Sequence, residues 1–482
     1  MSTSGRPVPV TRGEILCLLL ILAAATALRI PGLNSDLWLD EVIFLINGVR
    51  SPVTRLLSEF STDNTHVLYA LAAKASVSLF GESPFSMRIP AALLGLASLS
   101  AVWRLGRAWT APREALLAAA LLTVSFSHVW FSQNARGYTG LLLATVFSTD
   151  LYLRGRQSAR TGTWILYAVT VTLGMWMHLT MVFVAMAHGL VAAADAIRLR
   201  SMRAGAWKPF GAVLLAGLLT LFVYSLALTQ MFTFFGRPSG GASRTDSETQ
   251  TTTFLLTQSL DRFSGGHAAG LAAAGGGALV LVIGVVSYWR REKRIAVLFL
   301  LPAVLGLVCM VGLGRNLWPR FFFNSAGFGV LLAIRGISVL SEEAARRWPR
   351  WGAAAWPAMA SVLLIGTAFS LRSVYAYPKQ DFTGARDFVQ GLLGPSDCAV
   401  GVDVSAYVYS RHYAPHWKAA RNIAQLAEAQ CKGVIYVVYT LPRRLRAVHP
   451  ELFAHLEANY TLVRVFPGTL ADGTVYVRRS RD

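Results

Sequence analysis

The amino-acid sequence predicts a mainly α-helical, polytopic membrane protein that carries a small α/β domain at its C-terminal end. Of the 482 residues, 54% are hydrophobic and only 15% are charged, whereas ordinary soluble domains carry roughly 25% charged residues. Apolar runs, each near the roughly 20 residues that cross a bilayer as a helix, recur from Thr11 to Leu371. After Tyr377 the apolar stretches shorten and polar residues rise, which divides the chain into residues 1–377 and 378–482.

Eleven apolar segments are candidate membrane spans, and the first is too long, and lacks a cleavage site, to be a removed signal peptide. Arginines gather in alternate connections between them, as the positive-inside rule expects of cytoplasmic loops. This pattern predicts a cytoplasmic N-terminus and a C-terminal domain outside. The candidate spans are residues 11–30, 86–103, 114–131, 139–153, 163–177, 180–197, 209–230, 267–289, 295–313, 321–340 and 353–371.

Residues 66–80 form a further apolar stretch, but it is only about 15 residues long and carries Lys74 midway. If it crossed the membrane, every later arginine-rich loop would move to the outer side. We therefore predict an interfacial or re-entrant helix within an outer loop of residues 31–85.

The formal net charge of +20 would suggest nucleic acid in a soluble protein. Here the arginines lie in loops between apolar segments, so the partners we expect are membrane lipids and not nucleic acid. The composition, rich in arginine and alanine, suggests a GC-rich bacterial genome. The outer side of the predicted cytoplasmic (inner) membrane would then be the periplasm or the cell exterior.

The C-terminal region alternates helical and strand patterns, which predicts a small α/β domain. The predicted helices are residues 382–393, 422–430 and 450–459, and the predicted strands are residues 399–404, 433–439, 461–466 and 474–478. Cys398 and Cys431 each precede one of the buried strands, so in a parallel sheet they could meet at one edge. A disulfide and two unpaired cysteines both fit this pattern.

Acidic residues stand in the outer loop. Asp40 and Glu41 follow the first span directly; a carboxylate at the membrane surface can act as a general base, but acids in a first turn also cap helices. Asp63 fits either an N-cap or a position opposite Asp40. His66 lies in no metal-ligand spacing, so we expect neither a metal nor another cofactor.

Three arginines depart from the positive-inside trend, because Arg88, Arg136 and Arg320 are all predicted to lie outside. A guanidinium presents a rigid donor fork that suits phosphate. Arginine at a span end also reaches toward lipid headgroups, which is the alternative interpretation. Acids that activate a hydroxyl, beside arginines that hold phosphate, suit group transfer from a phosphorylated lipid.

Several motifs, in order, resemble those of the GT-C superfamily of polyprenyl-phosphate-sugar glycosyltransferases, in the protein-mannosyltransferase-like branch that includes the lipid A aminoarabinose transferase. Residues 37–41, Leu-Trp-Leu-Asp-Glu, are similar to its first-loop Asp-Glu signature. Residues 63–69, followed by Phe-Gly and Arg-Ile-Pro, are similar to its next run, although the paired prolines of the family are missing. Residues 132–138 and 319–321 resemble its Arg-x-Tyr and Pro-Arg-Tyr elements.

The resemblance implies a GT-C bundle of about eleven spans whose active site faces outward. The expected reaction is inverting transfer of a hexosyl or pentosyl group from a polyprenyl-phosphate-linked donor to a hydroxyl of a lipid, glycan or protein acceptor. Asp40 would be the general base, and Glu41 would assist or orient it. A membrane transporter or flippase of a lipid-linked or anionic substrate, and an inactive GT-C relative, are the alternatives. The resemblance assigns donor contacts to Asp63, His66, Arg88, Arg136, Tyr138 and Arg320.

Overall fold

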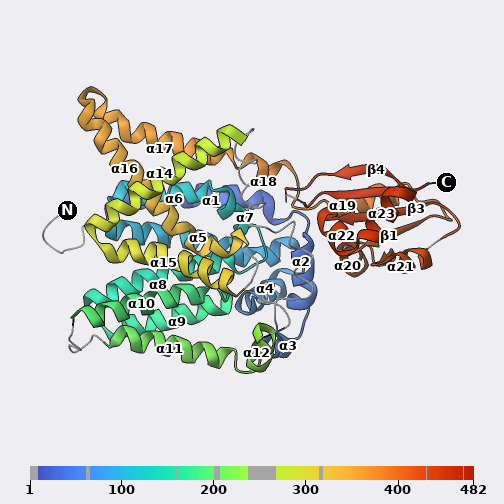
Figure 1. Cartoon of the computed structure of the whole chain (residues 1–482), viewed down its shortest axis with the longest axis horizontal. Coiled ribbons are helices and arrows are strands. Elements are labelled where there is room, and N and C mark those ends of the chain that lie inside the picture. Colours follow the sequence, from blue (N-terminus) through green and yellow to red (C-terminus); the bar gives the residue numbers. More distant parts are fainter. Residues whose placement is uncertain are drawn as a thin grey trace.

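The computed structural model describes residues 9–60, 66–158, 160–199, 207–236, 267–313, 318–429, 431–469 and 472–481. These residues form a bundle of long helices with a sheet domain at one end (Figure 1). The predicted class, a helical membrane bundle with a small C-terminal α/β domain, is confirmed at this level.

The bundle packs around a large apolar core, in which Leu99, Leu142 and Phe328 are completely buried. Its outer surface is also apolar, since Phe222 and Ile365 are 75% and 70% exposed. An apolar exterior around an apolar core is what a lipid environment requires. The main helices are α1 (Arg12–Leu33), α5 (Pro84–Trp109), α6 (Pro112–Thr123), α7 (Phe126–Ser132), α8 (Tyr138–Ser158), α9 (Thr161–Met177), α10 (Met181–Leu199), α11 (Lys208–Val223), α12 (Leu228–Gly236), α14 (His267–Arg291), α15 (Lys293–Gly312), α16 (Ala326–Arg347) and α17 (Gly352–Phe369).

Each of the eleven predicted spans coincides with helical structure, but fewer of them meet a simple test for crossing a membrane. By length and composition, five helices of the described ranges could cross, or up to seven if each of two bent pairs forms one span. The predicted spans 114–131 and 209–230 are not single straight helices. The chain turns by 62° between α6 and α7 and by 100° between α11 and α12. At the first break Ser125 has an extended backbone.

Short helices cover the end of the bundle next to the sheet domain (Figure 1). They are α2 (Leu39–Phe44), the π-helical turn η1 (Leu45–Val49), α3 (Val53–Ser58) and α4 (Val67–Phe80). Helix α4 is the predicted short helix of the first loop. Its Lys74 ammonium donates to the carbonyls of Val49 and Ser51 at 2.7 and 2.8 Å, which satisfies the charge within that loop.

The C-terminal domain is a five-stranded mixed sheet in the order β2-β1-β3-β5-β4, with β2, β1 and β3 parallel and β5 and β4 antiparallel. All four predicted strands are present within a few residues of their predicted bounds. The short β2, α20 and α22 were not predicted. The strands are β1 (Cys398–Val402), β2 (Lys418–Ala420), β3 (Ile435–Thr440), β4 (Tyr460–Phe466) and β5 (Val475–Ser480), and the helices are α19 (Phe382–Gln390), α20 (Val404–Val408), α21 (Ile423–Glu428), α22 (Pro442–Val448) and α23 (Pro450–Asn459). The short helix α18 (Arg372–Ala376) precedes the domain.

The domain is fastened both internally and to the bundle. Cys398 and Cys431 form a disulfide with a Cα–Cα distance of 6.1 Å, so of the two readings left open by the sequence the structure has the bonded one. One face of the sheet shares a continuous apolar cluster with the first outer loop, in which Val438 and Val477 belong with Leu37 and Val42. The first loop therefore lies between the bundle and the sheet.

Candidate active site

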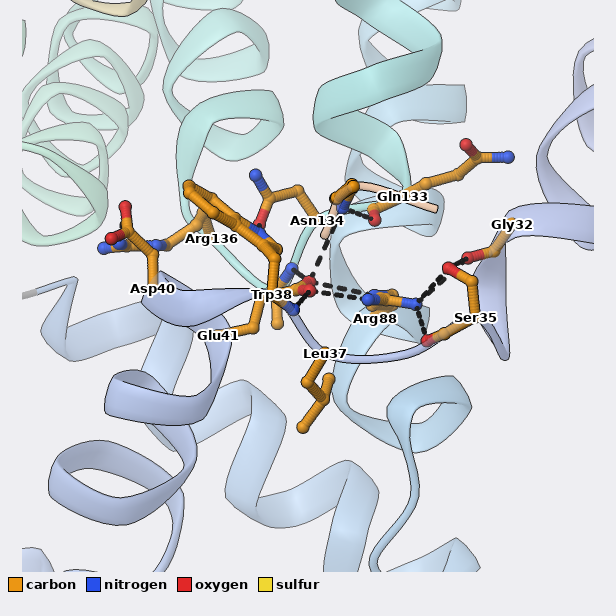
Figure 2. A network of polar contacts seen from close by, with 12 residues as sticks. Gly32, Ser35, Leu37, Trp38, Asp40, Glu41, Arg88, Gln133, Asn134 and Arg136 are labelled. Carbon is orange, nitrogen blue, oxygen red and sulfur yellow. Dashed lines mark hydrogen bonds and ion pairs between the residues drawn. The ribbon is translucent and has the colours of Figure 1, made fainter. Parts of the chain in front are cut away.

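The two neighbouring acids of the first loop point in different directions. Trp38 precedes α2 in an extended conformation, and its amide donates to the Glu41 carboxylate at 3.4 Å. Adjacent residues of a helix lie about 100° apart around its axis. Figure 2 shows the consequence, with Glu41 directed toward Arg88 and Asp40 lying beside Arg136.

Glu41 is completely buried in a set of donors that satisfies it. The Arg88 Nε and Nη2 atoms donate to its two carboxylate oxygens at 2.8 and 2.5 Å, and the Ala135 amide donates at 2.7 Å (Figure 2). A bidentate pair of this kind is the strong form of a carboxylate–guanidinium interaction. Glu41 thus acts as an anchor between the first loop, α5 and the turn that follows α7.

Arg88 is also completely buried, and its remaining donors hold the backbone of the first loop. The sequence analysis placed Arg88 among the donor contacts, but its guanidinium is enclosed by protein groups. We therefore assign it to the loop and not to the donor. The carbonyls that it binds belong to Gly32, Leu33, Ser35 and Asp36, at distances of 2.6 to 3.2 Å.

The surroundings of Glu41 keep it ionised. Burial alone would raise the pKa of Glu41, but the charges of Arg88 and Lys379 and the bonds from Arg88 and Ala135 lower it to about 2. Lys379 lies 3.7 Å from the same carboxylate. Burial lowers the pKa of Lys379 to about 7, although Glu41 acts in the opposite direction.

Asp40 has a different environment, because its side chain keeps 19% exposure and faces two arginines. The Arg136 Nη2 atom lies 2.6 Å from the Asp40 carboxylate, and the Arg320 Nη1 atom lies 3.6 Å from the same oxygen. Arg136 comes from the turn between α7 and α8, and Arg320 comes from the 3₁₀ helix η2 (Pro319–Ser325). The structure thus brings together three residues that the sequence placed on the outer face.

The turn that carries Arg136 is fixed from both sides. The Asn134 carboxamide oxygen accepts from the Trp38 indole at 3.3 Å, and the Gln133 side chain donates to the Arg29 carbonyl at 2.9 Å. At Gly137 a Cβ atom would lie only 2.6 Å from the Met177 carbonyl oxygen, so the close approach of these backbones requires glycine. The glycine thus lets the turn that carries Arg136 lie against the end of α9.

Two buried histidines and Tyr138 pack near these arginines. The His66 ring lies 5.0 Å from the His178 ring and 5.3 Å from the Tyr138 ring. His66 Nδ1 lies 2.9 Å from the Met177 carbonyl oxygen, which can only accept, so Nδ1 carries the proton and Nε2 is left as an acceptor. Burial, His178 and Arg136 lower the pKa of His66 well below its ordinary value, so this imidazole is neutral.

His178 has the opposite tautomer, because its Nδ1 accepts from the Thr180 amide at 3.2 Å. Burial and the charges of Arg320 and Arg136 lower the pKa of His178 to about 3. Within the described ranges no three His, Cys, Asp or Glu side chains are grouped as a metal site would need. Asp63 lies outside the described residues, so its predicted place opposite Asp40 stays a prediction.

The sequence analysis missed three residues of the C-terminal region that reach this site. The Gln380 carboxamide oxygen accepts from the Leu39 amide at 2.9 Å, and the Tyr413 hydroxyl donates to the Leu37 carbonyl at 2.7 Å. The Lys379 ammonium donates to the Gln133 carbonyl. No pattern in the sequence connects residues so far apart, although the change of composition after Tyr377 marks the place where they begin.

The charges of the site do not balance. Two carboxylates, those of Asp40 and Glu41, stand against three guanidiniums and the Lys379 ammonium. When Lys379 is protonated the site has an excess of two positive charges. An arginine pair at a partly open position, backed by a cationic surrounding, suits an anion such as a phosphate.

Part of the chain matches a known protein family. Residues 65–228 match the model of the dolichyl-phosphate-mannose-protein mannosyltransferase family. This segment includes Arg88, Arg136 and Tyr138 and begins after Asp40. No curated protein sequence matches the chain at a significant level.

Solved structures resemble the whole chain. ArnT from Cupriavidus metallidurans in the apo state matches with a TM-score of 0.56 and 14% identity, over 97% of this chain and 98% of that one. The same protein bound to undecaprenyl phosphate matches with a TM-score of 0.54 and 14% identity, over 98% of each chain. An oligosaccharyltransferase from Archaeoglobus fulgidus matches with a TM-score of 0.52 and 11% identity, over 95% of this chain and 72% of that one.

At such low identity these likenesses establish a shared fold, while the family match adds a relationship in sequence. Through residues 65–228 the chain is therefore similar in sequence to the dolichyl-phosphate-mannose-protein mannosyltransferase family, and over nearly its whole length it shares the fold of ArnT.

Proposed function

We propose that this protein transfers a sugar, with inversion, from a polyprenyl-phosphate-linked donor to an acceptor hydroxyl at the outer face of the cell membrane. The observation that carries the proposal is the partly exposed Asp40 carboxylate between Arg136 and Arg320, at 2.6 and 3.6 Å. A base and two phosphate-binding donors stand side by side there. The reaction needs the base near the acceptor hydroxyl and the arginines near the donor phosphate, so the two kinds of group must lie close together.

In the proposed reaction the acceptor oxygen attacks the anomeric carbon of the donor sugar. Its proton passes to the Asp40 carboxylate as the new C–O bond forms. The bond from the anomeric carbon to the phosphate oxygen breaks, and the polyprenyl phosphate leaves with the electron pair. Arg136 and Arg320 stabilise the negative charge that grows on that phosphate.

The ion pairs of Asp40 fit this scheme. A phosphate that approaches Arg136 and Arg320 competes with Asp40 for their donors, so donor binding frees carboxylate lone pairs for the acceptor hydroxyl. The excess of positive charge favours the phosphate. His66, with a buried acceptor nitrogen beside the arginines, suits a sugar hydroxyl better than a phosphate oxygen, because a neutral acceptor repels an anion.

The membrane topology belongs to the same proposal. Eleven crossings with an inner N-terminus put the first loop, the Arg136 turn, η2 and the C-terminal domain on the outer side. The arrangement in Figure 1 supports this, because α2, α4 and the sheet domain lie at the same end of the bundle. Undecaprenyl phosphate, which ArnT binds, is the kind of lipid product that we propose here.

The test uses the full-length protein in lipid vesicles with a panel of radiolabelled polyprenyl-phosphate sugars and an extract of envelope acceptors. Asp40→Asn is compared with Asp387→Asn, the same change at an exposed carboxylate of the C-terminal domain. We expect transfer from one donor by the native protein and the control. Asp40→Asn should lose about 10²- to 10⁴-fold in rate.

Other outcomes would count against the proposal. Equal activity of the native protein and Asp40→Asn would remove Asp40 from the chemistry. Release of polyprenyl phosphate from none of the donors, by any of the proteins, would favour a transporter or an inactive relative.

A further inference from the structure

We infer that Gln380 and Thr440 are positioning residues for Asp40, so that the C-terminal domain forms part of the catalytic centre. The inference rests on the proposed role of Asp40 as the base. It is carried by a chain of hydrogen bonds that runs from the sheet to the residue next to Asp40.

The chain of bonds has three members. The Leu39 amide donates to the Gln380 carboxamide oxygen at 2.9 Å. The Gln380 carboxamide nitrogen donates to the Thr440 hydroxyl at 3.1 Å, and this hydroxyl donates to the Thr474 carbonyl at 3.0 Å. Each donor therefore has an acceptor, and the direction of every bond is fixed.

The residues that form these hydrogen bonds are also shielded from solvent. Gln380 is 1% exposed and Thr440 is completely buried. Thr440 ends the central strand β3, which pairs with β1 on one side and β5 on the other. The Leu39 amide is thus linked, through Gln380, to the central strand of the domain.

Leu39 is the first residue of α2, and its amide belongs to the first-turn donors that find no partner within a helix. Gln380 supplies that partner from a distant part of the chain. Helix α2 has only six residues, too few to be stable on its own. Its orientation, and with it the direction of Asp40, must come from contacts outside the helix.

The C-terminal domain holds the loop on both sides of Trp38. Tyr413 binds the Leu37 carbonyl at 2.7 Å, while Gln380 binds the Leu39 amide. Arg88 and Glu41 fix the loop from the bundle side. A small rotation of α2 would carry Asp40 away from Arg136, and displacement of a reacting group by about 1 Å can cost roughly 10²-fold in rate.

The first variant is Thr440→Val, which keeps the shape of the side chain and removes the hydroxyl that Gln380 binds. Gln380→Met is the second, since it keeps most of the volume and removes both bonds. Ser410→Ala is the control, because it removes one hydroxyl bond, to Ala406 at 2.6 Å, within the same domain. All are made in the full-length protein in lipid vesicles.

Two quantities are measured for each variant: kcat and KM for the donor, normalised to folded protein, and hydrogen–deuterium exchange of the segment 37–44. We expect Thr440→Val to lower kcat by about 10-fold and Gln380→Met by roughly 10²-fold, with the donor KM unchanged, because the base and not the phosphate site moves. Exchange should rise in segment 37–44, while segment 133–138 and the control stay at native values.

Native kcat and native exchange in both variants would overturn the inference. So would an equal fall of kcat in Ser410→Ala, or a rise of exchange spread over the whole domain, since either would indicate general loosening. If the native protein itself transfers no sugar, the proposed function fails. The exchange experiment still decides whether Gln380 and Thr440 position α2.

Discussion

Glu41 and Asp40 are neighbours in the chain, yet their surroundings differ in almost every respect. Glu41 has no exposed surface and receives four hydrogen bonds, three of them short and directed. Asp40 keeps 19% exposure and touches two arginines through one oxygen. The surroundings of Glu41 use all of the hydrogen bonds that a carboxylate can readily accept, whereas those of Asp40 leave some of its acceptor positions available.

If Asp40 is the base, as we propose, this difference separates a supporting residue from a reacting one within one helical turn. A saturated, buried ion pair holds a backbone in place and has nothing left for a substrate. An open carboxylate between two cations can exchange partners when an anion arrives. Residue type does not distinguish the two acids, and only their surroundings do.

The largest effect is expected for Arg88→Met, which leaves Glu41 buried without its main partner. Loss of one member of a buried pair costs about 3–5 kcal/mol in free energy of unfolding. Thermal unfolding of the purified protein would measure it. Arg50→Met, which breaks an exposed pair with Glu82, should change stability by less than about 1 kcal/mol. If both variants lowered the unfolding temperature by similar amounts, the buried Arg88–Glu41 pair would be no more stabilising than the exposed Arg50–Glu82 pair, and our expectation would be wrong.

The Asp40 region should respond in rate and not in stability. Arg136→Gln is expected to lower kcat by roughly 10²–10³-fold, the usual loss when one charge-stabilising donor is removed, with little change of the unfolding temperature. Arg320→Gln should lose less, because Arg320 lies 3.6 Å from Asp40 against 2.6 Å for Arg136. Steady-state kinetics of the two variants decides the order, and the reverse order would show that Arg320 makes the main phosphate contact.

Low pH should destabilise the folded protein through protonation of Glu41. Its folded-state pKa of about 2 lies below the ordinary value of 4.5, so its stabilisation is fully present above pH 4.5 and is lost as the pH falls toward 2. Each pKa unit corresponds to about 1.4 kcal/mol, which gives about 3 kcal/mol over this window. The Asp40→Asn variant should still lose stability as the pH falls, whereas the Glu41→Gln variant should not. Unfolding temperatures of both variants, measured between pH 5 and pH 2, test this expectation. If Glu41→Gln lost stability in acid and Asp40→Asn did not, the acid sensitivity would belong to Asp40 and not to Glu41.

The smallest effect is expected for Lys379→Met. The variant loses a bond to the Gln133 carbonyl and the attraction of Glu41, but it also avoids burying an ammonium, whose pKa burial lowers to about 7. These contributions oppose each other, so the change near pH 7 should be about 1 kcal/mol or less. A loss as large as that of Arg88→Met, in the same unfolding assay, would mean that Lys379 shares equally in holding Glu41.

Much of the fold followed from local patterns in the sequence. Hydrophobic runs located helical structure for every predicted span, and alternation located four of the five strands. Local patterns failed where geometry was decided by tertiary contacts. The bend at Ser125 falls inside one continuous apolar run, and β2 is only three residues long.

Part of the candidate site was predictable from the sequence, but the role of each residue was not. Resemblance and loop position selected Asp40, Arg136 and Arg320, which the structure places together. Arg88 has the same charge and was predicted on the same side, and only its bonds to Glu41 and to the loop carbonyls show that it holds the loop. Gln380 could not have been found, because no local pattern reveals a partner 341 positions away.

That separation has a consequence for how the protein is made. The first loop emerges from the ribosome early, whereas its partner at position 380 and the strand that ends at Thr440 follow much later in synthesis. Until then the helix that carries Asp40 has the contacts from Arg88 but lacks the bond from Gln380. A chain that stops before residue 380 would contain every predicted span and still lack the bond that we propose orients Asp40. Assembly of the proposed active site is in this way tied to synthesis of the C-terminal domain.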